Sequence, residues 1–103
     1  MSSYRVRVHP EAWAEIRALP GHMRQRVRRA VRDLAVNPRP HQSQTMQPPT
    51  NVLGAAEELR RLRLDRWRVV YVVDDEWTEV VVLAVRRRPP YRYEDLVGLL
   101  AGR

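Results

Sequence analysis

The 103-residue chain contains neither cysteine nor lysine. Without cysteine, disulfide bonds and thiolate zinc sites are excluded. The 19 strongly basic residues are all arginines, which clamp phosphate through two N–H groups but hold their protons too tightly to act as general bases. No apolar run approaches the roughly 18 residues of a membrane span, and no apolar core of a signal peptide is present. We therefore expect a soluble cytoplasmic protein without a metal site or a cofactor.

The composition predicts one globular domain with an excess of positive charge. Apolar residues make up 44% of the chain, enough for one modest core, so we expect a single domain over residues 1–103. The formal net charge of +7 favours a polyanionic partner, either a nucleic acid or an acidic protein. Because like charges repel one another, an acidic partner that covers them would also stabilise the fold.

Two short valine-rich runs predict a buried β-hairpin. Val69–Val73 and Val80–Val85 are too short for helices, and a polar break at residues 74–76 separates them. Before them, basic and apolar residues alternate over Arg61–Leu64, which predicts a further strand with both arginines on one face. A tight turn at residues 65–66 would join that strand to the hairpin.

A basic and aromatic segment follows the hairpin. Four arginines, two prolines and two tyrosines make up residues 86–93, and three of the arginines are consecutive at residues 86–88. Beside the arginines of the preceding strand, such side chains suit phosphate groups and unpaired bases, so RNA is the leading candidate ligand. The acidic residues Glu94 and Asp95 then open a short C-terminal helix, because negative charge is favourable at a helix N-terminus.

The N-terminal part of the chain predicts one strand and two helices. Tyr4–Val8 alternates strictly, and Pro10 starts a helix that should end near Leu19. The stripe expected to be buried on this helix consists of Ala12, Trp13, Ile16 and Leu19. A second helix from about residue 22 to 36 should bury Met23, Val27, Ala30, Val31 and Leu34.

The outer face of the second helix carries arginines at intervals of four residues. Arg24, Arg28 and Arg32 form either a solvated face or a stripe for RNA phosphates or an acidic partner. Residues 37–57 are rich in proline and predict an ordered but irregular connection. The three histidines, His9, His22 and His41, fit solvent-facing or helix-capping positions better than a catalytic or metal-binding set.

The predicted element order is β-α-α-β-β-β-α. This order indicates an α+β fold with a mainly antiparallel four-stranded sheet. A helical hairpin should cover one face of the sheet, and a short C-terminal helix should follow the last strand. The second face would then remain for function, partly covered by the C-terminal helix.

Taken in this order, the motifs resemble the RelE/ParE superfamily of bacterial toxin–antitoxin toxins over nearly the whole chain. The most specific part is Leu62-Arg63-Leu64, Trp67-Arg68-Val69-Val70-Tyr71, Asp74-Asp75-Glu76 and Val81-Val82-Leu83, followed by a basic run and a tyrosine. The resemblance implies a RelE-like fold and a neutralising antitoxin partner. RelE-like members enter the ribosomal A site and cut mRNA between the 2′-oxygen and the phosphate without a metal. ParE-like members block DNA gyrase and lack the catalytic set.

The resemblance also implies individual site residues. The residues that match the RelE-like catalytic set are Arg61, Arg63, Arg68, Arg87 and Tyr93, or Tyr91 by the shorter spacing seen in many members. Contacts to RNA or the ribosome are expected from Arg24, Arg28, Arg32, Arg86 and Arg88. This chain departs from the family pattern at two places. The positions of Arg61 and Arg63 are often lysines in the family. A Gly-His or Gly-Lys pair usually precedes the arginine that matches Arg87, where this chain has Val85-Arg86.

These departures leave the general base open among Tyr93, Tyr91 and Glu58. Positive charge nearby favours the phenolate form of a tyrosine, so a tyrosine is the preferred candidate. Three functions stay open. The leading one is a ribosome-dependent mRNA endonuclease, and the others are a ParE-like gyrase inhibitor and a binding module without activity. In the last case the arginines would serve as a docking face for an acidic antitoxin.

Overall fold

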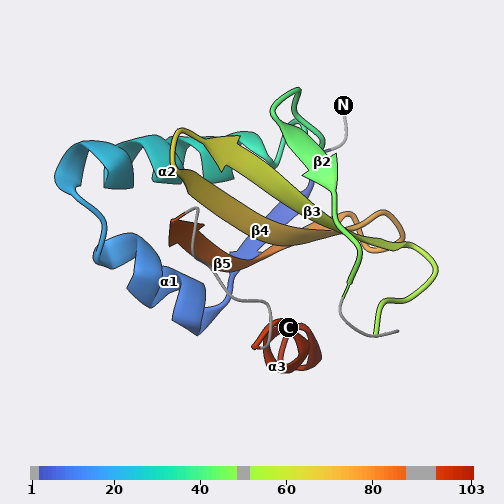
Figure 1. The fold of residues 1–103 in the computed structure, drawn as a ribbon. Helices are drawn as coiled ribbons and strands as arrows, with labels where there is room; N and C mark the ends of the chain where they lie inside the picture. Colours follow the sequence, from blue (N-terminus) through green and yellow to red (C-terminus); the bar gives the residue numbers. More distant parts are fainter. Residues whose placement is uncertain (1–2, 49–51, 88–94) are drawn as a thin grey trace.

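A computed structural model of the chain describes residues 3–48, 52–87 and 95–103, which form an α+β fold around one sheet (Figure 1). The elements are β1 (Arg5–Val8), α1 (Pro10–Arg17), α2 (Gly21–Asp33), β2 (Ser43–Thr45), β3 (Glu57–Leu64), β4 (Trp67–Asp74), β5 (Glu79–Arg87) and α3 (Leu96–Ala101). The five strands lie in the order β1-β5-β4-β3-β2. Only β1 and β5 pair in parallel, so the sheet is mainly antiparallel, as predicted.

The sheet has one more strand than the sequence predicts. The additional strand is β2, which lies inside the segment expected to be irregular and pairs antiparallel with β3. Its sequence, Ser-Gln-Thr, is short and polar and shows no alternation of apolar residues. Such a strand exists because a neighbouring strand offers it backbone partners, and a pattern within the strand itself cannot reveal that.

The two N-terminal helices begin and end where local chemistry places them. Pro10 is the first residue of α1, and the His9 Nδ1 atom accepts a hydrogen bond of 3.1 Å from the Glu11 backbone N–H. His9 is thus a capping residue, as the sequence suggests. Pro20 precedes α2, and both helices lie on the same side of the sheet (Figure 1).

The core under α1 and α2 confirms most of the predicted stripes. Alternate residues of the sheet face the helices and join their buried residues in one cluster, which contains Ala12, Ile16, Leu19, Met23, Val27, Val31, Leu34, Leu62, Val69, Tyr71, Val73, Val80, Val82 and Val85. The exception is Trp13, which was expected in the core but is 41% exposed. It lies at the edge of the helix layer with the Arg28 guanidinium 5.8 Å from its ring centroid.

The second face of the sheet has an apolar core of its own. The residues of this cluster are Leu59, Val70, Val72, Val81, Leu83, Ala84, Leu96, Leu99 and Leu100. Because both faces of β4 and β5 are covered, these strands read as continuous runs of buried residues rather than as an alternating pattern. The helix α3 therefore covers part of the second face, on the side opposite α1 and α2 (Figure 1).

The two hairpin turns position the strand ends. Asp65 adopts a positive φ of 55° in the two-residue turn between β3 and β4, a conformation that aspartate tolerates better than most residues. In the next turn, Asp74 Oδ1 accepts hydrogen bonds of 3.0 Å from the backbone N–H groups of Glu76 and Trp77. Trp77 itself is 70% exposed. None of the helices formed by the described residues is long and apolar enough to cross a membrane.

Candidate functional site

The register of the sheet brings three arginines into one row. Arg63 on β3 lies opposite Arg68 on β4, and Arg68 lies opposite Arg86 on β5. Residues opposite each other in antiparallel strands point to the same face, so the row runs across three strands on the second face of the sheet. Arg61 lies two residues before Arg63 and shares that face. Like charges directly opposite one another repel, so carboxylates or a bound anion beside the row would stabilise it.

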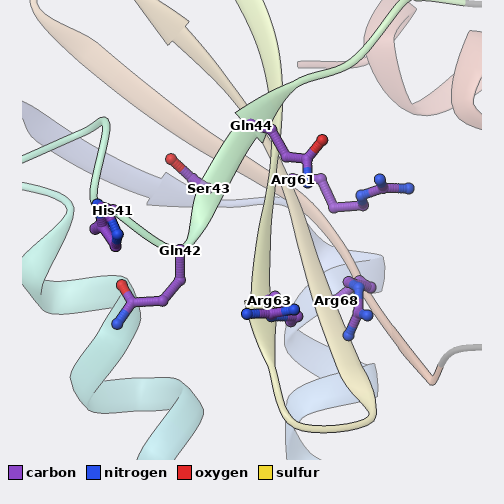
Figure 2. Close-up of a pocket in the computed structure, with 7 residues that line it drawn as sticks. All are labelled: His41, Gln42, Ser43, Gln44, Arg61, Arg63 and Arg68. Atoms are coloured by element: carbon purple, nitrogen blue, oxygen red, sulfur yellow. The ribbon is translucent and has the colours of Figure 1, made fainter.

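A pocket of about 200 Å³ lies at this row, between β2 and the β3–β4 hairpin (Figure 2). The described residues that line it are His41, Gln42, Ser43, Gln44, Arg61, Arg63 and Arg68. Figure 2 shows Arg63 and Arg68 next to each other near the β3–β4 turn, with Arg61 further along β3. No carboxylate occurs among these lining residues, so the charge that they contribute is positive.

Arg68 is the buried arginine of this pocket. It is only 5% exposed, and its Nη1 atom donates hydrogen bonds of 2.9 Å to the backbone oxygens of Asp65 and Trp67. These bonds fix the guanidinium at the end of the hairpin. A cation held in a partly water-excluded position acts on a nearby anion through a lower effective dielectric than a surface arginine does.

Arg86 occupies the third position of the row but is engaged in ion pairs. Its Nε atom lies 3.1 Å from Glu15 Oε2, and its terminal nitrogens donate to both carboxylate oxygens of Asp95. The hydrogen bond with Asp95, joined by the charge of Glu15, outweighs burial and raises the pKa of Arg86 further above its ordinary value. Arg86 therefore ties β5 to α1 and to the start of α3.

Arg87 points to the other face of β5. It lies opposite Trp67, which packs against the core under α1 and α2. The cause is an irregularity in the register, because Val70 pairs with Ala84 but Tyr71 pairs with Val82. Leu83 is thus an extra residue that reverses the faces of all later residues of β5. The structure brings Arg86, and not Arg87, next to Arg68. The catalytic role that the resemblance implies for Arg87 is untested, and the face on which Arg87 lies argues against it.

Glu58, the carboxylate candidate for the general base, lies on the face opposite the pocket. Its oxygens accept hydrogen bonds from Arg39 at 2.9 Å, from Arg60 at 2.8 Å and from the Thr45 hydroxyl. Burial by itself raises the pKa of Glu58, but the hydrogen bonds from Thr45, Arg39 and Arg60 outweigh it and hold that pKa below its ordinary value. This carboxylate is a structural partner of arginines.

Some predicted site residues lie outside the described part of the chain. These are Tyr91, Tyr93 and Arg88. The predicted stripe on α2 lies elsewhere on the molecule, on the helical side of the sheet. Arg28 and Arg32 border an apolar pocket that also contains Trp13, whereas Arg24 donates a hydrogen bond of 3.3 Å to the backbone oxygen of Arg17. The role of this stripe in RNA or ribosome binding stays a prediction.

The structure adds residues that the sequence analysis did not assign to the site. His41, Gln42 and Gln44 line the pocket, although the sequence places them in a proline-rich connection with no recognisable motif. What places these residues at the pocket is the pairing of β2 with β3, and the sequence alone does not reveal this pairing. Within residues 3–48, 52–87 and 95–103, no three His, Asp or Glu side chains cluster closely enough to hold a metal ion.

Solved structures with the same fold include complexes of a RelE toxin with a RelB antitoxin. The archaeal RelE–RelB complex from Pyrococcus horikoshii OT3 matches with a TM-score of 0.74 and 22% identity over 86% of this chain and 99% of that chain. The RelBE2 complex from Mycobacterium tuberculosis matches with a TM-score of 0.67 and 26% identity over 84% and 99% of the two chains. The intact E. coli RelBE complex matches with a TM-score of 0.60 and 23% identity over 82% of this chain and 96% of that chain.

Comparison with curated protein sequences gives no match. The sequence model of the ParE toxin of type II toxin–antitoxin systems (parDE) matches residues 6–89. This range includes most of β1, the two N-terminal helices, the strands β2 to β5 and the arginines of the pocket. The chain therefore belongs to the ParE toxin family of type II toxin–antitoxin systems, within the RelE/ParE superfamily.

Proposed function

We propose that this toxin is a ribosome-dependent mRNA endonuclease that inhibits translation in the cytoplasm. The observation that carries the proposal is the pocket of about 200 Å³ that gathers Arg61, Arg63 and the buried Arg68 on one face of the sheet. RNA cleavage by the 2′-hydroxyl passes through a phosphorane with additional negative charge. Positioned cationic donors stabilise such a transition state by a few kcal/mol each, and this needs no metal.

The reaction also needs a group that takes the proton of the 2′-hydroxyl. Arginine is unsuited to this role because it keeps its proton at neutral pH. His41 lines the pocket, and a neutral imidazole ring has one nitrogen that can accept a proton. Tyr93 and Tyr91 remain the candidates implied by the family resemblance. The position of Glu58 on the opposite face, in ion pairs with Arg39 and Arg60, argues against its use as the base.

The proposed partners follow from the family and the charge. A cognate antitoxin is expected because the family consists of toxins of toxin–antitoxin systems and because solved relatives are RelE–RelB complexes. With a net charge of +7, this chain favours an antitoxin with an acidic surface. The ribosome and its mRNA are the proposed targets, and no small-molecule cofactor or membrane takes part in the proposal.

A second candidate is inhibition of DNA gyrase without nuclease activity. The match to the ParE family model favours it, because ParE-like members act in this way. The arginine pocket distinguishes the two candidates, since gyrase inhibition gives no reason for cations gathered around one phosphate-sized space. In that case the pocket would be a docking surface for the antitoxin.

Primer extension on a translated transcript, after induction of the toxin in cells, tests the proposal. We expect cuts within the translated codons for the wild type and none for Arg68→Ala at equal protein level. Intact mRNA together with induction of the DNA-damage response would support the gyrase candidate. Intact mRNA without DNA damage would leave only the binding module.

A further inference from the structure

The strand β2 places two glutamines beside the arginines of the pocket. Gln44 lies opposite Arg61 in the register, and the backbone oxygen of Gln42 accepts a hydrogen bond of 3.1 Å from the backbone N–H of Arg63. Residues opposite each other point to the same face, so both side chains share the face of the arginines. Gln42 and Gln44 are exposed, and both line the pocket (Figure 2).

The other face of β2 holds the strand in place. Ser43 Oγ accepts hydrogen bonds of 2.8 and 3.2 Å from Arg60 and donates one of 2.7 Å to the backbone oxygen of Pro40. Thr45 donates to Glu58 and accepts a bond of 3.2 Å from Arg60. These contacts leave β2 little freedom to shift, so the two glutamines are presented from a fixed backbone, as recognition of a defined ligand requires.

Amides and arginines suit different parts of a nucleotide. A glutamine carries no charge and adds little to the attraction of phosphate, but its amide offers one acceptor and two donor hydrogens in a planar group. Adenine presents an N6 donor next to an N7 acceptor, which a glutamine amide matches with two hydrogen bonds. Guanine presents two acceptors at the same edge. In unpaired RNA these edges are accessible to side chains.

We propose that Gln42 and Gln44 read the edge of an unpaired adenine next to the phosphate held by Arg61, Arg63 and Arg68. This assignment rests on the proposed endonuclease function and adds a base preference to it. The arginines attract any phosphodiester, whereas the glutamines favour cleavage beside adenine. The residues of β2 thus determine specificity, and the arginine row provides the chemistry.

Cleavage on programmed ribosomes tests this assignment. The mRNAs differ only in the base at each position of the A-site codon, and single-turnover rates are measured for the full-length wild type, Gln42→Ala, Gln44→Ala and the double variant. We expect the wild type to cut beside adenine about ten-fold faster than beside the other bases. The double variant should lose this preference while it keeps its rate on codons without adenine.

Two further variants separate the possible causes of a change. Gln25→Ala removes an exposed glutamine from α2 and should leave both rate and preference as in the wild type. Arg63→Ala should slow cleavage on all codons by a similar factor, because a phosphate contact is independent of sequence. A wild type without adenine preference, or a double variant that keeps it, would overturn the assignment. A wild type that cuts no codon would instead overturn the proposed endonuclease function itself.

Discussion

Arg60 and Arg61 are neighbours on β3, yet they point to opposite faces of the sheet and meet different surroundings. The Arg60 side chain is 11% exposed and lies 2.8 Å from both Glu58 Oε2 and Ser43 Oγ. Arg61 lines the pocket, whose described lining residues include no carboxylate. The alternation of a strand therefore sorts adjacent arginines into one that holds the fold together and one that faces a ligand site.

The same distinction between arginines in structural ion pairs and arginines that line the pocket applies to others in the molecule. Carboxylates accompany many of those outside the pocket, in the pairs Arg7–Glu79, Arg26–Asp65, Arg39–Asp75, Arg86–Asp95 and Arg103–Glu57. The pocket instead gathers Arg61, Arg63 and Arg68 around a space of about 200 Å³. A phosphate bound there would meet three arginines at once, which together attract it more strongly than a single arginine does.

The largest expected effect is the loss of cleavage when arginines of the pocket are replaced. Arg61→Gln combined with Arg63→Gln removes two cationic donors and should lower the single-turnover rate on saturated ribosomes by about 10³-fold. The variant should stay folded, because neither side chain belongs to an apolar core cluster of the described residues. Rapid-quench cleavage and thermal unfolding measure the two effects. Full activity of this variant would contradict the division between the two faces.

Replacement of Arg60 should have the opposite result. Arg60→Gln leaves Glu58 with its bonds from Arg39 and Thr45, so we expect a loss of about 1–2 kcal/mol in the free energy of unfolding. The melting temperature should then fall by roughly 4–12 °C for a domain of this size. The cleavage rate on saturated ribosomes should change much less than in the Arg61 and Arg63 double variant. A stable but inactive Arg60→Gln variant would show that the faces are not separate in function.

The stripe on α2 should contribute to affinity and little to chemistry. Replacing Arg24, Arg28 and Arg32 together by glutamine should weaken ribosome binding several-fold and reduce the slope of log affinity against log salt, because fewer phosphates are contacted. The cleavage rate of bound complexes should remain. Arg29→Gln, on the same helix but outside the stripe, is the matched control. An unchanged salt slope would remove the stripe from the ribosome-binding surface.

The smallest expected effect is a loss of stability in acid. Arg39 and Tyr4 hold the pKa of Asp75 below its ordinary value of 3.8, and Arg86 does the same for Asp95. A carboxylate with a lowered pKa stabilises the fold above its unfolded pKa, and this contribution disappears as the pH falls through the folded value. Stability should therefore decline below about pH 4, by less than about 1 kcal/mol for each of these exposed pairs.

Denaturant unfolding at pH 3 and pH 6 measures this contribution. Asp95→Asn should be less stable than the wild type at pH 6, and the difference should be smaller at pH 3, because the wild type loses this contribution as the pH falls below the ordinary pKa of aspartate. Glu76→Gln, which changes an exposed carboxylate in the β4–β5 turn, is the control. An equal deficit of Asp95→Asn at both pH values would assign the effect to packing rather than to charge.

Most of the fold could be predicted because strong patterns determine it. The valine runs of β4 and β5 and the apolar stripe of α2 match the observed cores closely. Trp13 failed as a core residue because helical spacing places it on the buried stripe, whereas the helix layer ends at its position and leaves it 41% exposed beside Arg28. The strand β2 was not predicted because its short polar sequence shows no strand pattern, and it forms a strand only through its pairing with β3.

The site was predicted less completely than the fold. Strict alternation placed Arg61 and Arg63 correctly on one face, and Arg68 joins them because no bulge interrupts the pairing of β3 and β4. On β5 the extra residue Leu83 reverses the faces, and this is why Arg86 rather than Arg87 continues the row. A bulge of this kind leaves no clear mark in a run of valine, leucine and alanine.

Single-turnover cleavage of mRNA on purified ribosomes, compared between Arg68→Ala and Arg87→Ala, tests most directly whether the pocket face is the catalytic face. Arg68→Ala should lose at least about 10²-fold in rate while it still binds ribosomes, because it removes the buried cation of the pocket. Arg87→Ala should stay within about three-fold of the wild type, since a change on the opposite face removes no contact to the phosphorane. Cleavage by Arg68→Ala at the wild-type rate, or loss of activity in Arg87→Ala alone, would contradict the account.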